Sequence, residues 1–245
     1  GRYSPELMAA QAGKFGLLKE NGLNYAYHID ATRYGRYLRQ LAESHGARRI
    51  EGKVVQVDQA DQGDIRSLRL DDGQIVEGDF FIDCSGFAGL LIDKTLHTDY
   101  QDWSHWLPCD RAVAVQTQSV SPPIPYTRSI AQESGWQWRI PLQSRVGNGL
   151  VFSSEYLSDD EATHRLLDGV EGDTLIEPRV IPFRTGQRHR HWSKNCVALG
   201  LAAGFLEPLE STSIHLIQRG IIRLMQMFPY GGVNTSDQRE FNRQM

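Results

Sequence analysis

Two short segments with a nearly continuous apolar centre constrain this fold more than any other feature of the sequence. Residues 79–84 read Asp-Phe-Phe-Ile-Asp-Cys, residues 195–199 read Asn-Cys-Val-Ala-Leu, and a turn containing glycine follows each of them. Strands of this composition are typical of parallel sheets, in which both faces of a strand are covered. We therefore expect two buried strands that belong to a parallel sheet.

The residues before the first of these segments predict a helix and then a hairpin. The helix is expected from about Asp30 to His45, because the Asp30 carboxylate can accept hydrogen bonds from the amides of the first turn and Gly46 suits a left-handed end. The apolar residues of this helix fall on one face: Tyr34, Tyr37, Leu38 and Leu41. Three extended segments follow, over residues 50–57, 65–70 and 74–76. Helix, hairpin and buried strand in this order indicate an α/β fold with α+β character.

The region between the two buried strands has a different character. It is rich in strand-like segments, which we expect over residues 111–118, 127–132, 136–142 and 150–156. A hairpin turn is expected at Val146–Gly149 and a helix at Asp159–Leu167. We interpret this region as a mostly antiparallel sheet inserted into, or laid beside, the α/β part, and we predict three parts, residues 1–98, 99–190 and 191–245. Such junctions are a common place for a ligand site.

Composition excludes several classes of protein. The chain has 245 residues, a net charge of −4 and 40% hydrophobic residues, which suffices for a core and excludes a disordered chain. No apolar stretch reaches the roughly 18 residues of a membrane span, and the first residues lack a signal-peptide pattern. Three widely spaced cysteines imply neither a disulfide framework nor a metal site. We expect a cytoplasmic protein that binds no nucleic acid, and both a monomer and a homodimer remain open.

The segment after the second buried strand carries the richest chemistry. Residues 200–214 read Gly-Leu-Ala-Ala-Gly-Phe-Leu-Glu-Pro-Leu-Glu-Ser-Thr-Ser-Ile. Small residues in this position let a backbone approach a bulky planar ligand. Ser211 or Thr212 is expected to cap a helix that ends before Pro229 and whose apolar face is formed by Ile217, Ile221, Leu224 and Phe228.

The first turn of this helix is a candidate anion site. The amides of Thr212, Ser213 and Ile214 have no partner within a helix and can hold an anion. Glu210 lies directly before them. The alternative is that Glu210 is only a carboxylate favoured by the positive end of the helix dipole. We expect residues 211–214 to open an α-helix and Glu210 to be sheltered from bulk water.

The turn after the first buried strand is a second candidate site. It reads Asp83-Cys84-Ser85-Gly86-Phe87 and leads into Leu90-Leu91. A strand, a small-residue turn and a helix are how doubly wound folds meet a nucleotide cofactor, which makes Asp83 and Gly86 candidate cofactor contacts. A plain connection from strand to helix is the alternative.

A strand with two tryptophans is the third feature. In Gly135-Trp-Gln-Trp-Arg-Ile-Pro141 the strand period places Trp136, Trp138 and Ile140 on one face. Two neighbouring indoles form a rigid apolar wall. An aromatic strip within the core fits this spacing equally well.

Together, these three segments resemble the flavin-dependent tryptophan halogenases. The complete Gly-Trp-x-Trp-x-Ile-Pro string, Leu-Glu-Pro-Leu-Glu-Ser-Thr at 206–212 and Asp-Cys-Ser-Gly-Phe at 83–87 carry the resemblance, and residues 24–30 agree with it. It extends over about residues 24–228. The resemblance implies a flavoprotein-monooxygenase-like FAD-binding fold and FADH2-dependent chlorination or bromination of tryptophan, or of a related indole or electron-rich aromatic, of the kind used in antibiotic biosynthesis.

The resemblance also implies the partners of the reaction. A separate flavin reductase supplies FADH2, O2 and chloride or bromide are co-substrates, and hypohalous acid passes through an internal tunnel to a small aromatic substrate. Glu210 matches the catalytic glutamate that stabilises or deprotonates the cationic ring, and Ser211 matches a serine between the flavin and substrate sites. Thr212 and Ser213 match the pair that holds the halide.

Further residues match positions near the flavin. Leu201, Ile214 and either Val54 or Val55 match backbone positions in contact with it. Trp136 and Trp138 match the indoles that keep substrate away from the reactive flavin and so prevent hydroxylation.

Some family features are absent from these 245 residues. The Gly-x-Gly-x-x-Gly fingerprint and the catalytic lysine are missing, and Lys14 and Lys19 stand in the wrong context to replace that lysine. The C-terminal helical region that supplies most substrate-binding aromatics is missing as well. Ser213 replaces a frequent glycine, which predicts a tighter halide site. We therefore expect a piece of the enzyme that is inactive by itself, with a hydroxylase of the same fold or an inactive flavin-binding module as alternatives.

The histidines give weaker signals. His189 and His191 would lie on one face of a strand and could bind a metal, but Arg188 and Arg190 disfavour a cation there and a third ligand is not evident. We predict no metal site. His28 and His215 are expected to be hydrogen-bonded structural residues.

Overall fold

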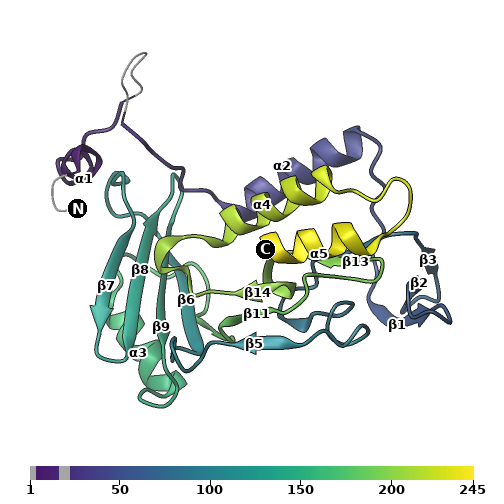
Figure 1. Cartoon of the computed structure of the whole chain (residues 1–245). Coiled ribbons are helices and arrows are strands. Elements are labelled where there is room, and N and C mark those ends of the chain that lie inside the picture. Colours follow the sequence, from purple (N-terminus) through teal and green to yellow (C-terminus); the bar gives the residue numbers. More distant parts are fainter. Residues whose placement is uncertain (1–3, 17–22) are drawn as a thin grey trace. The chain divides into compact units, whose positions relative to one another are not determined.

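The computed structural model describes residues 4–16 and 23–245 (Figure 1), and the chain divides into two compact units. Unit 1 comprises residues 1–49 and 109–182, and unit 2 comprises residues 50–108 and 183–245. Lys19 and the first three residues, where a signal pattern was sought, lie outside the described part. The predicted limits 1–98, 99–190 and 191–245 stay a prediction.

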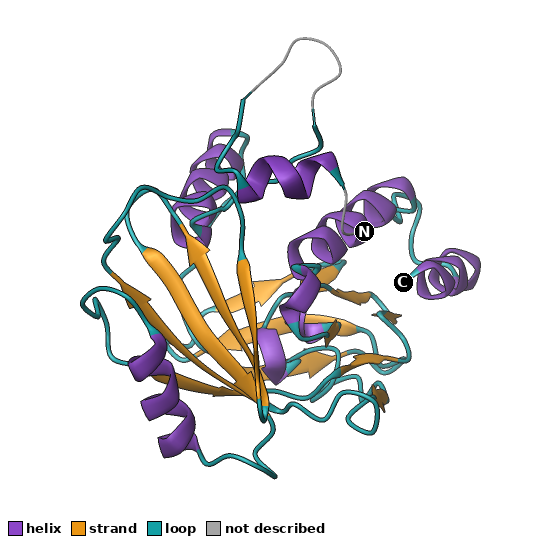
Figure 2. Ribbon diagram, turned by 90° about the vertical axis from the view of Figure 1, so that its left-hand side faces the viewer, coloured by secondary structure: helices purple, strands orange, loops and turns teal. Residues whose placement is uncertain are grey.

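Unit 1 is built on a five-stranded antiparallel sheet with the order β10-β6-β9-β8-β7. Its strands are β6 (Arg111–Thr117), β7 (Arg128–Gln132), β8 (Gly135–Pro141), β9 (Val146–Phe152) and β10 (Arg179–Pro182). Helix α3 (Asp159–Gly169) covers one face of the sheet (Figure 2) and begins with a capping box between Ser158 and Glu161. The core between them contains Val113, Val115, Leu150, Phe152, Leu157, Ala162 and Leu166. The predicted antiparallel sheet and its helix are thus confirmed.

The hairpin turn predicted at Val146–Gly149 is wrong, because these residues lie inside β9. The turn falls just before the strand, where the Leu142 amide donates to the Arg145 carbonyl at 2.8 Å. Gly149 is explained by a close approach instead. A Cβ atom at this position would lie 2.0 Å from the indole of Trp138.

Two helices precede the sheet of unit 1 in sequence, α1 (Pro5–Gln11) and α2 (Ala31–Ser44). As predicted, the Asp30 side chain caps α2 by accepting from the amides of Thr32 and Arg33, and Gly46 has a positive φ of 94°. Asp30 also pairs with Arg145 at 3.3 Å. The predicted apolar face is exposed in the described structure: Tyr34, Tyr37, Leu38 and Leu41 are between 37% and 60% exposed.

Unit 2 contains three small sheets. The first is an antiparallel sheet of β1 (Val54–Gln59), β2 (Ile65–Leu70) and β3 (Ile75–Glu77), close to the predicted hairpin segments. The second joins β5 (Tyr100–Asp102), β11 (Gly186–Arg188) and β14 (Gly204–Phe205). The third joins β12 (Trp192–Ser193), β13 (Cys196–Ala198) and β4 (Phe81–Asp83).

The two expected buried strands are β4 and β13, and they pair in parallel as predicted. All three residues of β13 are buried. β4 is covered on one face only, because Phe81 and Asp83 are buried while Ile82 between them is 47% exposed. The prediction that both faces of this strand are covered is therefore wrong. β4 forms the edge of its sheet, and the described residues cover the face on which Ile82 lies only in part.

Helices α4 (Ser213–Gln226) and α5 (Thr235–Gln244) complete unit 2. They share a core of Trp192, Val197, Leu199, Leu224 and Phe241 with the third sheet. The apolar face predicted for α4 is only partly buried, since Leu224 is 4% exposed whereas Ile221 and Phe228 are 42% and 39% exposed. Among the described helices, none is both long and apolar enough to span a membrane.

Candidate active site

The segment after β13 is a series of short turns made of small residues. Leu199 leads into a 3-10 turn, η2 (Gly200–Ala202), where Gly200 has a φ of 64° that suits glycine. Ala202 and Ala203 are buried against Ile92, while Leu201 is 40% exposed. Leu201, a predicted flavin contact, therefore stands on an accessible turn with little side-chain bulk around it.

The turn before α4 has a strained backbone. The 3-10 turn η3 (Pro208–Glu210) ends at Ser211, which adopts φ 57° and ψ 36°. This left-handed conformation is uncommon for residues other than glycine, and such strain gathers at functional sites. Helix α4 begins at Ser213, directly after Thr212. The helix thus opens at Ser213 with Thr212 at its N-cap, whereas Ser211, which was expected to belong to the start of the helix, lies outside it in a left-handed conformation.

Thr212 is at the N-cap position, but its side chain makes no capping hydrogen bond. This corrects the prediction that Ser211 or Thr212 caps the helix through its hydroxyl. The physical reason is the αR conformation of Thr212, φ −80° and ψ −18°, whereas a capping residue is usually extended. Its Oγ1 atom is buried and has no hydrogen-bond partner. An unused hydroxyl next to the free amides of a first turn makes a group of donors suited to an anion.

The two glutamates of this turn differ in their surroundings. Glu210 is exposed, contrary to the expectation of a sheltered side chain, so the described residues do not exclude water from it. Glu207 is half-buried, and its Oε2 atom is buried without a partner. Sequence reasoning missed Glu207, because the motif gives no sign of which carboxylate points inward.

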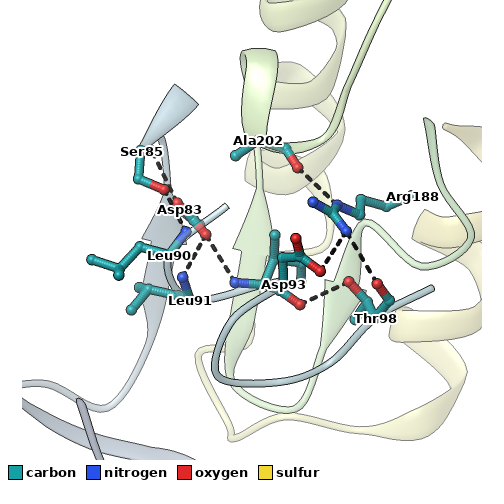
Figure 3. A network of polar contacts seen from close by, with 9 residues as sticks. Asp83, Ser85, Leu90, Leu91, Asp93, Thr98, Arg188 and Ala202 are labelled. Atoms are coloured by element: carbon teal, nitrogen blue, oxygen red, sulfur yellow. Dashed lines mark hydrogen bonds and ion pairs between the residues drawn. The ribbon is translucent and has the colours of Figure 1, made fainter. Parts of the chain in front are cut away.

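The turn after β4 is organised by Asp83, which is 2% exposed. Its Oδ1 atom accepts from the Ser85 amide at 2.9 Å, and its Oδ2 atom accepts from the amides of Leu91 and Ile92 at 2.8 Å each (Figure 3). The predicted helix is replaced by a 3-10 turn, η1 (Gly86–Ala88), and further turns. The carboxylate holds amides eight and nine residues away, which folds the chain back toward the strand.

Val54 and Val55 lie beside a hollow of about 320 Å³ within unit 2. Leu90, Lys94, Thr95 and His97 line the same hollow. The segment that follows Asp83 and Gly86 therefore reaches the hollow at Val54 and Val55 through Leu90 and later residues, whereas Asp83 and Gly86 do not line it. Lys94 adds a cation there, which suits a phosphorylated cofactor.

The cysteines near these turns are poor nucleophiles. Burial, and secondarily the Asp83 carboxylate, raises the pKa of the Cys196 thiol to about 12. The same two causes, in the same order, raise the pKa of Cys84. A thiol with a raised pKa is protonated at neutral pH and reacts slowly. Cys84 and Cys196 are therefore poorly suited to act as thiolate nucleophiles.

The two predicted indoles share one face of β8 in unit 1. The ring centroids of Trp136 and Trp138 are 6.0 Å apart. Trp136 is 9% exposed and its Nε1 atom is buried without a partner. On the other face of the strand Gln137 and Arg139 are buried as well, and Arg139 pairs with Glu171 at 2.8 Å. The strand is thus part of a packed sheet, whatever further role the indoles have.

The described histidines serve no evident metal site. No group of three or more potential ligands occurs among the described residues. His28 is hydrogen-bonded as expected, through Nδ1 to the Pro141 carbonyl and through Nε2 to the Thr127 hydroxyl. His191 is buried with neither ring nitrogen paired, and this burial, aided by the Arg188 charge, lowers its pKa to about 4.

Comparison with known proteins defines the class of this fold and site. In the solved structures of a flavin-dependent halogenase from Xanthomonas campestris and of BrvH, a flavin-dependent halogenase from Brevundimonas sp. BAL3, the same fold recurs. The first is 55% identical with a TM-score of 0.95 over 98% of this chain and 48% of that one. The second is 48% identical with a TM-score of 0.92 over 96% of this chain and 50% of that one. These are flavoprotein folds of the α+β type.

The family follows from a direct match. The tryptophan halogenase family model matches residues 1–245, and the chain belongs to this family. Tryptophan 7-halogenase RebH from Lentzea aerocolonigenes is 38% identical over 91% of this chain and 43% of the relative. Tryptophan 6-halogenase ThaL from Streptomyces albogriseolus is 41% identical over 84% of this chain and 40% of the relative. The chain thus spans less than half the length of these curated relatives.

Proposed function

We propose that the protein is an FADH2-dependent halogenase of tryptophan or a related electron-rich aromatic. Its co-substrates would be O2 and chloride or bromide, and a separate reductase would supply the reduced flavin. The observation that carries this proposal is the start of α4, where the buried, unpaired hydroxyl of Thr212 and the first-turn amides directly follow Glu210. The names of the curated relatives, which are tryptophan halogenases, support the choice of substrate.

The turns of unit 2 fit a flavin cofactor. Gly200 and the two alanines after Leu201 add little side-chain bulk to their turn, and the Asp83 turn and the hollow at Val54 and Val55 belong to the same unit. Residues that would contact FAD are Val54, Val55, Asp83, Gly86, Leu201 and Ile214. When bound, reduced FAD would supply, with O2, the two-electron oxidation of halide to hypohalous acid.

The donors at the start of α4 would hold the halide. Thr212 can donate its hydroxyl hydrogen, and the amides of Ser213 and Ile214 point out of the helix end. The positive end of the helix dipole adds to the attraction for an anion. Ser211, in its left-handed conformation, joins this turn to Glu210 and would lie between the flavin and the substrate.

Glu210 would act on the aromatic ring. Electrophilic halogen adds to a ring carbon and forms a cation, which a nearby carboxylate stabilises. The carboxylate then takes the proton from that carbon, the aromatic ring is restored, and water is the other product of the reaction with hypohalous acid. General-base assistance of this type contributes about 10²–10⁴-fold.

Trp136 and Trp138 belong to unit 1 and would form a wall near the flavin. Their shared face on β8 and the packing of Trp138 over Gly149 give a rigid apolar surface. This wall would keep the organic substrate away from the reactive flavin and so favour halogenation over hydroxylation. A cytoplasmic location, and a monomer or homodimer, complete the proposal.

The test uses the protein at the full length that its gene encodes. It is incubated with FAD, a flavin reductase, bromide or chloride, and a panel of tryptophan, indole and other electron-rich aromatics, and products are identified by mass spectrometry. We expect a product with the bromine or chlorine isotope pattern only when halide is present. A hydroxylated product regardless of halide would identify a hydroxylase instead. Flavin binding with no product across the panel would identify an inactive flavin-binding module.

A further inference from the structure

We propose that Arg188 is a positioning residue for the flavin, because it joins the turn after β4 to the turn after β13. This inference rests on the proposed flavin site. Arg188 ends β11, and its side chain is 5% exposed. Neither the halogenase motifs nor the spacing of residues in the sequence points to it.

The Arg188 guanidinium bonds to two separate parts of unit 2. Nε donates to the Ala202 carbonyl at 3.3 Å, and Nη1 donates to the Thr98 carbonyl at 3.2 Å (Figure 3). Nη1 also pairs with the Asp93 carboxylate at 2.8 Å. In addition, the Arg188 backbone amide donates to the Ala203 carbonyl at 2.8 Å. One residue thus contacts both η2 and the far end of the segment that begins at Asp83.

These contacts belong to a chain of hydrogen bonds that connects the two turns. The Asp83 carboxylate accepts from the Ile92 amide, and the Ile92 carbonyl accepts from the Thr98 hydroxyl at 2.7 Å. The Thr98 carbonyl in turn accepts from the Arg188 guanidinium, which also donates to the Ala202 carbonyl. The Leu199 amide, three residues before Ala202 in the chain, donates to the Asp83 carbonyl at 3.0 Å, so the backbone of residues 199–202 completes the connection between the two turns. The two turns are therefore fixed relative to each other by side chains as well as by the paired strands.

The two turns carry the accessible residues that a planar ligand would meet. Phe87 of η1 and Leu201 of η2 are 42% and 40% exposed. Phe87 also packs edge to face against Phe205, with ring centroids 5.3 Å apart. A shift of one turn relative to the other would therefore change the surface that both present to the flavin.

The surroundings of Arg188 favour a role in positioning rather than in stability alone. Its guanidinium lies 5.0 Å above the Tyr100 ring, and Nη2 is so close to Gly89 that a Cβ atom there would lie 2.9 Å away. Burying a charge is costly, and apolar residues of similar size often replace buried ion pairs without loss of stability. A planar fork of five N–H groups can reach acceptors in different directions, which a lysine cannot do.

Arg184 offers a matched control. Its guanidinium lies over the same Tyr100 ring at 4.1 Å, but its side chain is 57% exposed and its ion pair with Asp102 is long, at 3.8 Å. The experiment measures the dissociation constant of FAD and the visible spectrum of the bound flavin in the full-length protein. The variants are Arg188→Met, Arg188→Lys and Arg184→Met.

We expect Arg188→Met to weaken FAD binding about tenfold, equivalent to about 1.4 kcal/mol, and to shift the visible spectrum of the bound flavin. Arg188→Lys should restore part of the affinity, and Arg184→Met should stay within about twofold of the wild type. Unchanged FAD affinity and spectrum in Arg188→Met, or equal effects in Arg188→Met and Arg184→Met, would overturn the inference.

A second variant covers the case in which Arg188→Met does not fold. Asp93→Asn weakens the ion pair to Arg188 at a carboxylate whose side chain is 43% exposed, so the fold should tolerate it. We expect FAD affinity to fall about threefold in this variant, and an unchanged affinity would overturn the inference. The outcome is separable from the proposed function, since FAD binding is measured without halide or substrate. A wild-type protein that binds no FAD would refute both.

Discussion

The turns after β4 and β13 follow neighbouring parallel strands, yet they are held in different ways. The turn after β4 is held from within, by the Asp83 carboxylate at its own start. The turn after β13 has no such side chain among its glycines and alanines, and it is held from outside by Arg188. The difference shows that a turn made of small residues, which has no polar side chain of its own to hold it, needs its support from elsewhere in the fold.

The largest effect on this comparison is expected from removing the Asp83 carboxylate, which holds the turn after β4 from within. Asp83→Ala leaves the buried amides of Leu91 and Ile92, and the partly buried amide of Ser85, without their acceptor. Each unpaired buried group costs about 1–3 kcal/mol, so we expect the free energy of unfolding to fall by about 4 kcal/mol, measured by urea denaturation. Asp72→Ala is the control, because this exposed turn residue accepts one hydrogen bond, from the Gln74 amide. A similar loss in both variants would contradict the assigned role of Asp83.

A smaller effect is expected from adding a side chain at Gly89, next to Arg188, which holds the turn after β13 from outside. Gly89→Ala introduces a side chain at φ 50° and places its Cβ 2.9 Å from both Arg188 Nη2 and Asp93 Cβ. We expect a loss of about 2–3 kcal/mol in the free energy of unfolding. Gly73→Ala is the control, since Gly73 also has a positive φ but no atom within 4 Å of such a Cβ, and it should lose only about 1 kcal/mol. Equal losses would show that Arg188 does not need the space at Gly89.

Acid should lower the free energy of unfolding through His191, which follows β11 in the chain. The pKa of this residue is lowered to about 4 in the folded protein, chiefly by burial, so the unfolded chain binds more protons between pH 6.5 and pH 4. The contribution of neutral His191 is therefore complete above pH 6.5 and is lost as the pH falls to about 4. We expect a loss of up to about 3 kcal/mol in this window, measured as the free energy of unfolding against pH.

Two variants check the source of this acid sensitivity. His191→Leu should reduce it and should cost little at pH 7, because neither ring nitrogen has a partner to lose. His164→Gln, on the exposed side of α3 in unit 1, should retain it. Retention of the full acid sensitivity in His191→Leu would assign it to other groups.

The smallest effect concerns the unpaired hydroxyl at the start of α4, which, unlike the amides of the Asp83 turn, has no partner to lose. Thr212→Val keeps the shape of the side chain and removes the donor. We expect the KM for chloride or bromide to rise about fivefold, equivalent to about 1 kcal/mol, with unchanged stability. Thr212→Ser should retain an almost normal KM. A Val variant with wild-type halide kinetics would remove Thr212 from the proposed halide site.

Much of the fold could be predicted from local patterns. Asp30 and Gly46 mark the ends of α2, the apolar segments at β4 and β13 do pair in parallel, and the strands of unit 1 fall near their predicted positions. These features depend on neighbours in the sequence, so composition and periodicity reveal them.

The errors have a common physical cause, which is contact between distant residues. Gly149 suggested a turn, but it is small because the Trp138 indole packs on it. The exposure of Ile82 depends on what covers β4, and the strand itself does not reveal this. Arg188 bonds to residues 14 and 90 positions away, so no local motif contains it.

Glu210→Gln is the measurement that tests the central claim most directly. In the full-length protein with FAD, reductase, bromide and tryptophan or indole, the amide can no longer take a proton from the ring. The account predicts at least a hundredfold loss of brominated product while the rate of flavin reoxidation stays within twofold of the wild type. Because Glu210 is exposed, unfolding by urea should be unchanged. Wild-type amounts of brominated product from Glu210→Gln would contradict the account.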